Sequence, residues 1–167
     1  MHLYIIRHAK AAVGDSHTPD AMRPLTPRGR EKFRRAAEGL RRMTPRIELI
    51  LFSPLLRSRQ TAEILATALG SDSDRPIQME KADFLAPPGR LDALLSRLAE
   101  VKSLTGNVAI VGHEPMLSTW IGRICFDQPG RCEMKKGGMA IIELSTGGHG
   151  RLWCLLPPIV LRRMANR

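Results

Sequence analysis

The sequence predicts an α/β protein: a three-layer sandwich in which a mostly parallel central sheet carries helices on both faces and ends in an antiparallel C-terminal hairpin. Short apolar runs that stop at polar clusters alternate with longer segments whose apolar residues recur at helical spacing, which is the pattern of β-α-β units. Near the C-terminus, two apolar runs instead flank a glycine-rich turn, as in a hairpin. No stretch has the composition of a linker, so we expect one domain over residues 1–167.

The first half of the chain is expected to form two strands and two helices. Residues 2–6 make an apolar strand, and a polar loop follows it. Thr26 has the features of a helix N-cap, and Pro27 suits the first helical position, where its missing N–H costs nothing. The apolar face of this helix contains Phe33, Ala36, Ala37, Leu40 and Met43, and its basic face contains Arg30, Arg34, Arg35, Arg41 and Arg42. A strand over 47–52 and a helix over 56–69 come next.

The second half is expected to continue the alternation and to close with the hairpin. In chain order, its elements are a polar connection over 71–76, an edge strand over 77–80, a helix over 91–101, a strand over 108–112, a helix over 115–124 and hairpin strands over 139–144 and 152–156. Pro157 and Pro158 should end the last strand. The residues beyond them are basic, and we expect a partly frayed tail.

Composition limits the classes of function without choosing among them. The net charge of +10 favours acidic partners: phosphate esters, phosphoproteins, nucleic acid or an anionic surface. Aromatic residues make up only 4%, which disfavours the stacking platforms that bind single-stranded nucleic acid. Cys125, Cys132 and Cys154 lack metal-ligand spacing, so we expect reduced thiols in a cytoplasmic protein. No apolar stretch approaches the roughly 20 residues of a membrane span.

Polar clusters follow three of the predicted strands. Arg7 and His8 come directly after the first, Arg57 follows the second, and His113 follows the strand over 108–112. Because the carboxyl ends of parallel strands meet at one edge of a sheet, these four side chains should converge. Arginine makes paired hydrogen bonds to phosphoryl oxygens, a neutral histidine can attack phosphorus, and a second, protonated histidine can stabilise developing charge. The residues themselves therefore predict a phosphate site with a nucleophilic nitrogen.

The same residues lie in motifs that resemble the histidine phosphatase superfamily, which is also called phosphoglycerate mutase-like. Residues 3–8 resemble its "RHG" signature, with Ala9 in place of the glycine. Residues 23–29 resemble the "RPLT..G" stretch, residues 53–62 resemble the "SP..R..QTA" segment, and residues 111–115 resemble the motif around the second histidine. The motifs follow the order of the family, and the short chain resembles the SixA-type phosphohistidine phosphatases.

The resemblance implies a role for each residue of the cluster. His8 would be the nucleophile and become a phosphohistidine, while Arg7 and Arg57 would bind the phosphoryl oxygens. His113 would complete the pocket and stabilise the transition state. Water would then hydrolyse the intermediate, and neither a metal nor an organic cofactor is implied. The implied partner is a phosphorylated protein, for example a histidine phosphotransfer domain, or a small phosphate ester.

A general acid is the family feature without a clear counterpart. Larger members carry a carboxylate between the second and third motifs, where this chain offers Glu80 and Asp83, neither at the family spacing. We interpret Glu114 as a residue that favours a helix start. A phosphoramidate nitrogen is basic and easily protonated, so a missing acid favours phosphohistidine over alkyl esters. Only about 20 residues separate Gly70 from the helix near Arg90, so we expect an open, shallow site that suits a protein substrate.

Three other functions stay open at this point. A small-molecule phosphomonoesterase of the same superfamily would be favoured if Asp83 or Glu80 faced the pocket. A nucleic-acid-binding module would use the basic surface, although the low aromatic content and the lack of a nucleic-acid motif disfavour it. An inactive phosphohistidine reader is disfavoured because all four residues of the cluster are present.

Overall fold

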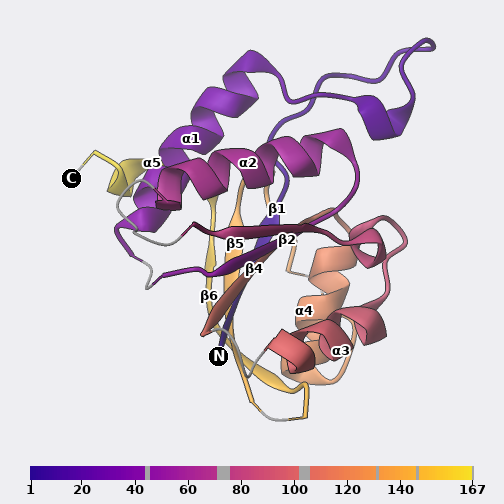
Figure 1. The fold of residues 1–167 in the computed structure, drawn as a ribbon, viewed down its shortest axis with the longest axis vertical. Helices are drawn as coiled ribbons and strands as arrows, with labels where there is room; N and C mark the ends of the chain where they lie inside the picture. The colour runs from indigo at the N-terminus through magenta and orange to yellow at the C-terminus, as the bar shows by residue number, and fades with distance from the viewer. Residues whose placement is uncertain (44–45, 71–75, 102–105, 131, 146, 167) are drawn as a thin grey trace.

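Strands and helices alternate along the chain, as Figure 1 shows. The computed structural model describes residues 1–43, 46–70, 76–101, 106–130, 132–145 and 147–166, so most of the predicted connection over 71–76 lies outside the described residues. The strands are β1 (His2–Arg7), β2 (Leu49–Phe52), β3 (Gln78–Lys81), β4 (Asn107–Gly112), β5 (Met139–Leu144) and β6 (Gly150–Leu156). The helices are α1 (Pro27–Arg41), α2 (Leu56–Gly70), α3 (Leu91–Val101), α4 (Met116–Phe126) and α5 (Pro158–Met164), with the 3-10 turns η1 (Asp20–Met22) and η2 (Asp83–Leu85). Of the helices described, none has the length and apolar character to span a bilayer.

The strands form one sheet in the order β3-β2-β4-β1-β5-β6. The first four strands of the sheet run parallel, whereas β5 is antiparallel to β1, and β6 is antiparallel to β5. The register pairs Arg7 of β1 with Gly112 of β4, and Phe52 of β2 with Val111 of β4. The carboxyl ends of β1, β2 and β4 therefore lie side by side at one edge. The predicted parallel sheet with an antiparallel C-terminal hairpin is confirmed.

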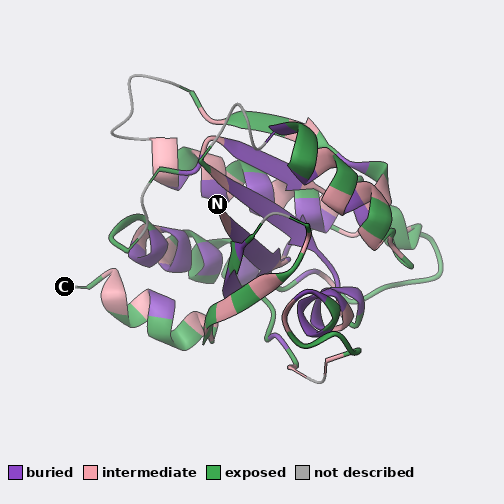
Figure 2. Cartoon of the chain, turned by 90° about the horizontal axis from the view of Figure 1, so that it is seen from below, coloured by how far each residue is buried: buried purple, intermediate pink, exposed green. Residues whose placement is uncertain are grey.

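Each face of the sheet has its own apolar core. Leu3 and Ile5 of β1 pack with buried residues of α3 and α4, whereas Tyr4 and Ile6 pack with buried residues of α1, α2 and α5. In Figure 2 the central strands are buried, and the helices bury one side and expose the other. Successive side chains of a strand point to opposite faces, so the uninterrupted apolar run of β1 fits a strand that is covered on both sides. The predicted three-layer sandwich is confirmed.

Helix α1 begins as the sequence predicts. Thr26 is its N-cap, because the Thr26 hydroxyl accepts a hydrogen bond of 2.9 Å from the Gly29 N–H, and Pro27 occupies the first helical position. A Cβ atom at Gly29 would lie 2.2 Å from the carbonyl oxygen of Lys10. Glycine at this position therefore lets the first turn of α1 lie against the loop that leaves β1.

The expectation of a frayed basic tail is wrong. Pro158–Met164 form α5, and Leu161 is buried in the core that lies under α1. A Cβ atom at Gly39 of α1 would lie 1.8 Å from the Leu161 carbonyl oxygen, so the two backbones touch. The signal that sequence reasoning missed was Pro158 at a first helical position, followed by the apolar residues Ile159, Val160 and Leu161.

Candidate active site

The two predicted histidines leave neighbouring strands and meet at the carboxyl edge of the sheet. The His8 backbone N–H donates to the Gly112 carbonyl oxygen at 3.0 Å, which fixes the end of β1 against the end of β4. The His8 and His113 rings have centroids 5.0 Å apart with an interplanar angle of 54°. Arg7 and Arg57 are close enough to influence the charge state of both rings. The structure thus brings together the four residues, Arg7, His8, Arg57 and His113, that we call the catalytic cluster.

A hydrogen bond to the backbone fixes the tautomer of His8 and leaves its Nε2 free. Its Nδ1 lies 2.7 Å from the Ala9 carbonyl oxygen, and because a carbonyl can only accept, Nδ1 carries the proton. The lone pair is therefore on Nε2. Burial lowers the pKa of His8 to about 4, and the nearby charges of Arg57, Arg7 and Lys136 act in the same direction, although the Ala9 contact opposes them. At neutral pH, His8 is an uncharged imidazole with a nucleophilic Nε2.

His113 is buried among hydroxyl groups. Its Nε2 lies 2.9 Å from the Ser53 Oγ and 3.2 Å from the Ser58 Oγ. A hydroxyl can donate or accept, so these two serines can serve His113 in either protonation state. Burial lowers the pKa of His113 to about 3, with further lowering by His8, Arg57 and Arg7 that Asp20 partly offsets. Burial and the neighbouring cations therefore favour the neutral form of His113 in the unliganded protein.

Each arginine of the cluster is anchored through terminal nitrogens of its guanidinium, Arg7 through Nη1 and Arg57 through both Nη1 and Nη2. Arg7 donates from Nη1 to the Met134 carbonyl oxygen at 2.5 Å. Arg57, in the first turn of α2, donates to the backbone carbonyl of Asp20 at 2.8 Å and to its carboxylate at 3.0 Å. Among the described residues, neither arginine has a partner for its buried Nε. An unmade hydrogen bond on a buried donor costs about 1–3 kcal/mol, so the cluster has donor capacity for an anionic ligand.

Glu114 contacts Arg7 indirectly, through the backbone of Met134. Its carboxylate accepts hydrogen bonds from the Ser118 hydroxyl at 2.5 Å and from the Met134 N–H at 2.9 Å. Met134 is the residue whose carbonyl holds Arg7. The interpretation of Glu114 as a residue at a helix start agrees with its contact to the backbone of α4, and its second contact gives it a positioning role for Arg7.

The two candidate acids engage other partners. Glu80 lies on the edge strand β3 and forms a two-point contact with Arg97, with nitrogen–oxygen distances of 2.7 and 3.1 Å. Asp83 has a side chain that is 79% exposed, and it pairs with Lys81 at 3.6 Å. Of the hydrogen bonds and ion pairs between described residues, none links either carboxylate to the catalytic cluster.

Sequence reasoning missed the residues that hold the cluster in place. Asp20 anchors Arg57, and Ser53 and Ser58 flank His113. Thr61 accepts from the Ala9 N–H at 3.1 Å and donates to the Arg57 carbonyl at 2.6 Å, which joins α2 to the loop after His8. Ser53 could have been found, because it follows directly on β2 within the segment that also contains Arg57. Asp20 lies in an irregular polar loop, where no periodicity indicates which side chain turns inward.

The side chains of the candidate site are largely buried. His8, Arg57 and His113 are only 7%, 6% and 3% exposed. The loop between β1 and α1 contacts Arg57 through the Asp20 carbonyl of η1. The open, shallow site that the short segment before α3 indicates stays a prediction.

Comparison with known proteins identifies the family. The profile described as "Histidine phosphatase superfamily (branch 1)" matches residues 3–86, which is half of the chain. An uncharacterised protein from Picosynechococcus sp. is 39% identical over 149 residues, covering 88% of this chain and 86% of its own length. Phosphohistidine phosphatase SixA from Escherichia coli K12 is 28% identical over 161 residues and covers 94% of both chains.

Solved structures agree with the sequence comparison. The protein histidine phosphatase SixA in complex with tungstate superimposes with a TM-score of 0.84 at 26% identity, over 96% of this chain and 99% of that chain. A phosphoglycerate mutase from Bacillus anthracis shares the fold, with a TM-score of 0.76 at 14% identity over 99% and 96% of the two chains. The chain belongs to the histidine phosphatase superfamily, and it is a phosphatase of the SixA type.

Proposed function

We propose that this phosphatase works without a metal, through a covalent phosphohistidine on His8, and that its substrate is a phosphohistidine on a protein. The observation that carries the proposal is the state of His8: its Nδ1 is bound to the Ala9 carbonyl, its low pKa keeps it neutral, and two arginines lie beside it. A neutral imidazole with a free Nε2 is a competent nucleophile toward phosphorus.

The first displacement follows from these positions. The Nε2 lone pair of His8 attacks phosphorus, and the bond between phosphorus and the substrate nitrogen breaks with its electron pair on that nitrogen. The leaving imidazole takes up a proton from solvent water, which its basic nitrogen accepts readily. Arg7 and Arg57 supply positive charge and donors for the phosphoryl oxygens, which is the main requirement of a loose phosphoryl-transfer transition state.

The second displacement returns the enzyme to its starting state. A water oxygen forms a bond to phosphorus as the bond to His8 Nε2 breaks, and inorganic phosphate is released. His113 is neutral in the empty pocket, so it can accept the proton of this water, and it releases that proton to solvent as phosphate leaves. A bound phosphoryl dianion opposes the positive field of the arginines, so the protonated form of His113 becomes favourable only when the pocket is occupied.

Two observations support phosphohistidine as the substrate. The curated relative from Escherichia coli is named for activity on phosphohistidine. In addition, the candidate acids Glu80 and Asp83 engage Arg97 and Lys81, and a substrate with a basic leaving nitrogen does without a dedicated acid. We place the reaction in the cytoplasm, since the three cysteines are free thiols, as a reducing compartment keeps them.

The decisive assay compares wild type, His8→Ala and the control His149→Ala in the presence of a chelator. The substrates are a phosphohistidine-containing protein and a panel of sugar and nucleotide phosphates. We expect His8→Ala to lose at least about 10³-fold in kcat/KM on the phosphoprotein, and His149→Ala, which lies on the surface, to keep wild-type activity.

Other outcomes would change the assignment. Full activity of His8→Ala removes His8 as nucleophile. Turnover of metabolite phosphates alone points to a small-molecule phosphomonoesterase of the same superfamily. Tight binding to nucleic acid that falls steeply with salt, together with no turnover of any phosphate, would favour a nucleic-acid-binding module.

A further inference from the structure

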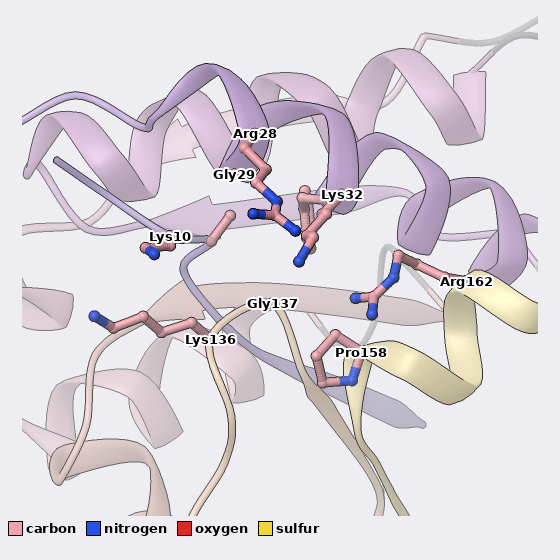
Figure 3. A pocket seen from close by; sticks show the side chains of 10 residues that line it. Lys10, Arg28, Gly29, Lys32, Lys136, Gly137, Pro158 and Arg162 are labelled. Atoms are coloured by element: carbon pink, nitrogen blue, oxygen red, sulfur yellow. The ribbon is translucent and has the colours of Figure 1, made fainter.

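A second pocket lies beside the catalytic cluster, on the side of α1 and α5. Its cavity measures about 180 Å³, and it is lined by Ala9, Lys10, Arg28, Gly29, Lys32, Phe33, Lys136, Gly137, Pro158 and Arg162. Figure 3 shows the side chains of Arg28 and Lys32 reaching in from α1 and that of Arg162 from α5. We call it the basic pocket, because half of its lining residues are cationic and none is acidic.

The cations of the basic pocket are unpaired as far as the described residues go. Within the described part of the chain, no ion pair involves Lys10, Arg28, Lys32, Lys136 or Arg162. On the same helix, by contrast, Arg34 pairs with both Glu31 and Glu38. The positive charges of Arg28, Arg162 and Lys10 lower the pKa of Lys32. The pocket therefore concentrates mutual repulsion that a bound anion would relieve.

Two close backbone contacts bring the cations of the basic pocket together. Glycine is required at position 29, where α1 lies against the Lys10 carbonyl, because a Cβ atom there would lie 2.2 Å from the carbonyl oxygen. Arg28 and Lys32 are four residues apart on α1, so their side chains lie on one face of the helix. Lys10, from the loop after β1, lines the same pocket. Arg162 is added by α5, whose packing needs the second close approach, between Gly39 and Leu161. Two close backbone contacts thus set cations from three segments around one cavity.

The basic pocket shares a wall with the catalytic cluster. Ala9 lines the pocket and directly follows His8, so their Cα atoms are about 3.8 Å apart. Gly137, which also lines the pocket, donates its N–H to the Arg7 carbonyl at 3.1 Å and to the His8 carbonyl at 3.2 Å. The charge of Lys136 lowers the pKa of His8, while burial and the charges of Arg7, Arg23, Lys10 and Arg57 lower the pKa of Lys136 itself. The pocket and the catalytic cluster are therefore neighbours that the same segments of the chain build.

We infer that the basic pocket is a second oxyanion site, which binds a second anionic group of the same substrate, a phosphate or a carboxylate. The inference rests on the proposed function, because it defines the substrate class of the same reaction. The cavity is smaller than the about 300–1,000 Å³ of pockets that enclose whole ligands, so it fits one anionic group. On a protein, this group is an acidic side chain or a second phosphate near the phosphohistidine.

Tungstate, a phosphate analogue, tests binding directly. Calorimetric titration of wild type should show two tungstate sites, one lost in Arg57→Ala and the other lost in Lys32→Glu and in Arg162→Glu. Arg30→Glu is the matched control: it lies on the same helix, is exposed, does not line the pocket and changes the net charge equally. Arg30→Glu should keep both sites. A single site that Lys32→Glu and Arg162→Glu leave intact overturns the inference.

Steady-state kinetics show whether the basic pocket binds a second group of the substrate or an independent anion. For a substrate with two phosphate groups, Lys32→Glu should raise KM about tenfold. For p-nitrophenyl phosphate, which has one anionic group, kcat and KM should stay within about twofold of wild type. An equal response of both substrates shows a site for a free anion and overturns the substrate assignment. Failure of the proposed function is seen separately, in the activity of His8→Ala.

Discussion

The catalytic cluster and the basic pocket use the same kinds of side chain in opposite ways. In the cluster, Arg57 is buried and held by the Asp20 carbonyl and carboxylate. In the basic pocket, Lys32 is exposed and Arg162 is half-buried, and among the described residues neither has an acidic partner. Anchored donors can be aimed at a transition state, whereas charges without an anchoring partner provide attraction without fixed geometry. The difference assigns bond-making to the cluster and binding to the pocket.

The largest contrast is expected between two arginine deletions. Arg57→Ala should lower kcat by about 10²- to 10³-fold, because it removes fixed donors from the transferring phosphoryl group. Arg162→Ala should leave kcat on p-nitrophenyl phosphate unchanged, because its charge acts only in binding. Steady-state kinetics on both variants provide the check, with circular dichroism to confirm folding. A comparable fall of kcat in both variants would contradict the assignment of catalysis to the cluster and of binding to the basic pocket.

The second contrast is in the titration of the histidines. His8, with a pKa lowered to about 4, and His113, with a pKa lowered to about 3, should stay neutral as the pH falls from 7 to 5. Lys136→Met removes a charge that lowers the pKa of His8, so the pKa of His8 should rise in this variant. Adding tungstate should raise the pKa of His113. NMR titration of the imidazole protons measures all three, and a His8 that titrates near 6.5 in wild type would contradict the buried, cation-flanked environment.

The hydroxyl groups around His113 should matter less than the arginines. Replacing Ser53 and Ser58 together by alanine removes both neighbours of the His113 Nε2. Two hydrogen bonds of about 1 kcal/mol each predict a fall in kcat of roughly thirtyfold. Ser96→Ala, at an exposed position on α3, is the control and should behave as wild type. An unchanged kcat in the double variant would mean that His113 is positioned by packing alone.

The smallest effect is expected for the carboxylate that contacts the cluster, Asp20. Asp20 neutralises part of the Arg57 charge, but its side chain is 63% exposed. Asp20→Asn leaves the backbone carbonyl that holds Arg57 in place, so we expect tungstate to bind more tightly, by up to about fivefold. Calorimetry measures the affinity, and weaker binding would show that the carboxylate orients Arg57 rather than competing with the ligand.

The sequence predicted the cluster because each member follows a strand end. Strand order and register then bring Arg7, His8 and His113 to one edge, and these depend on periodicities that the sequence displays. Asp20 was not predictable in this way, because its contact with Arg57 depends on the path of an irregular loop. Helix α5 was missed because it is short and is stabilised by packing on α1 rather than by its own propensity.

The basic pocket was invisible to sequence reasoning for a related reason. Its cations come from the loop after β1, from α1, from the segment before β5 and from α5. In the sequence, Arg28 and Lys32 belong to a strongly basic helix, where most charges are solvated. Only the close approach of α1 to the Lys10 carbonyl, which Gly29 permits, distinguishes these two from their neighbours.

Trapping the phosphorylated enzyme tests the central claim most directly. Wild-type protein is mixed with a phosphohistidine substrate, quenched in alkali within milliseconds and examined by mass spectrometry. We predict phosphate on His8 at Nε2, because Nδ1 holds its proton against the Ala9 carbonyl, and no label on His8→Ala. Phosphate on another residue, or turnover with no phosphorylated enzyme at any quench time, would contradict catalysis through His8.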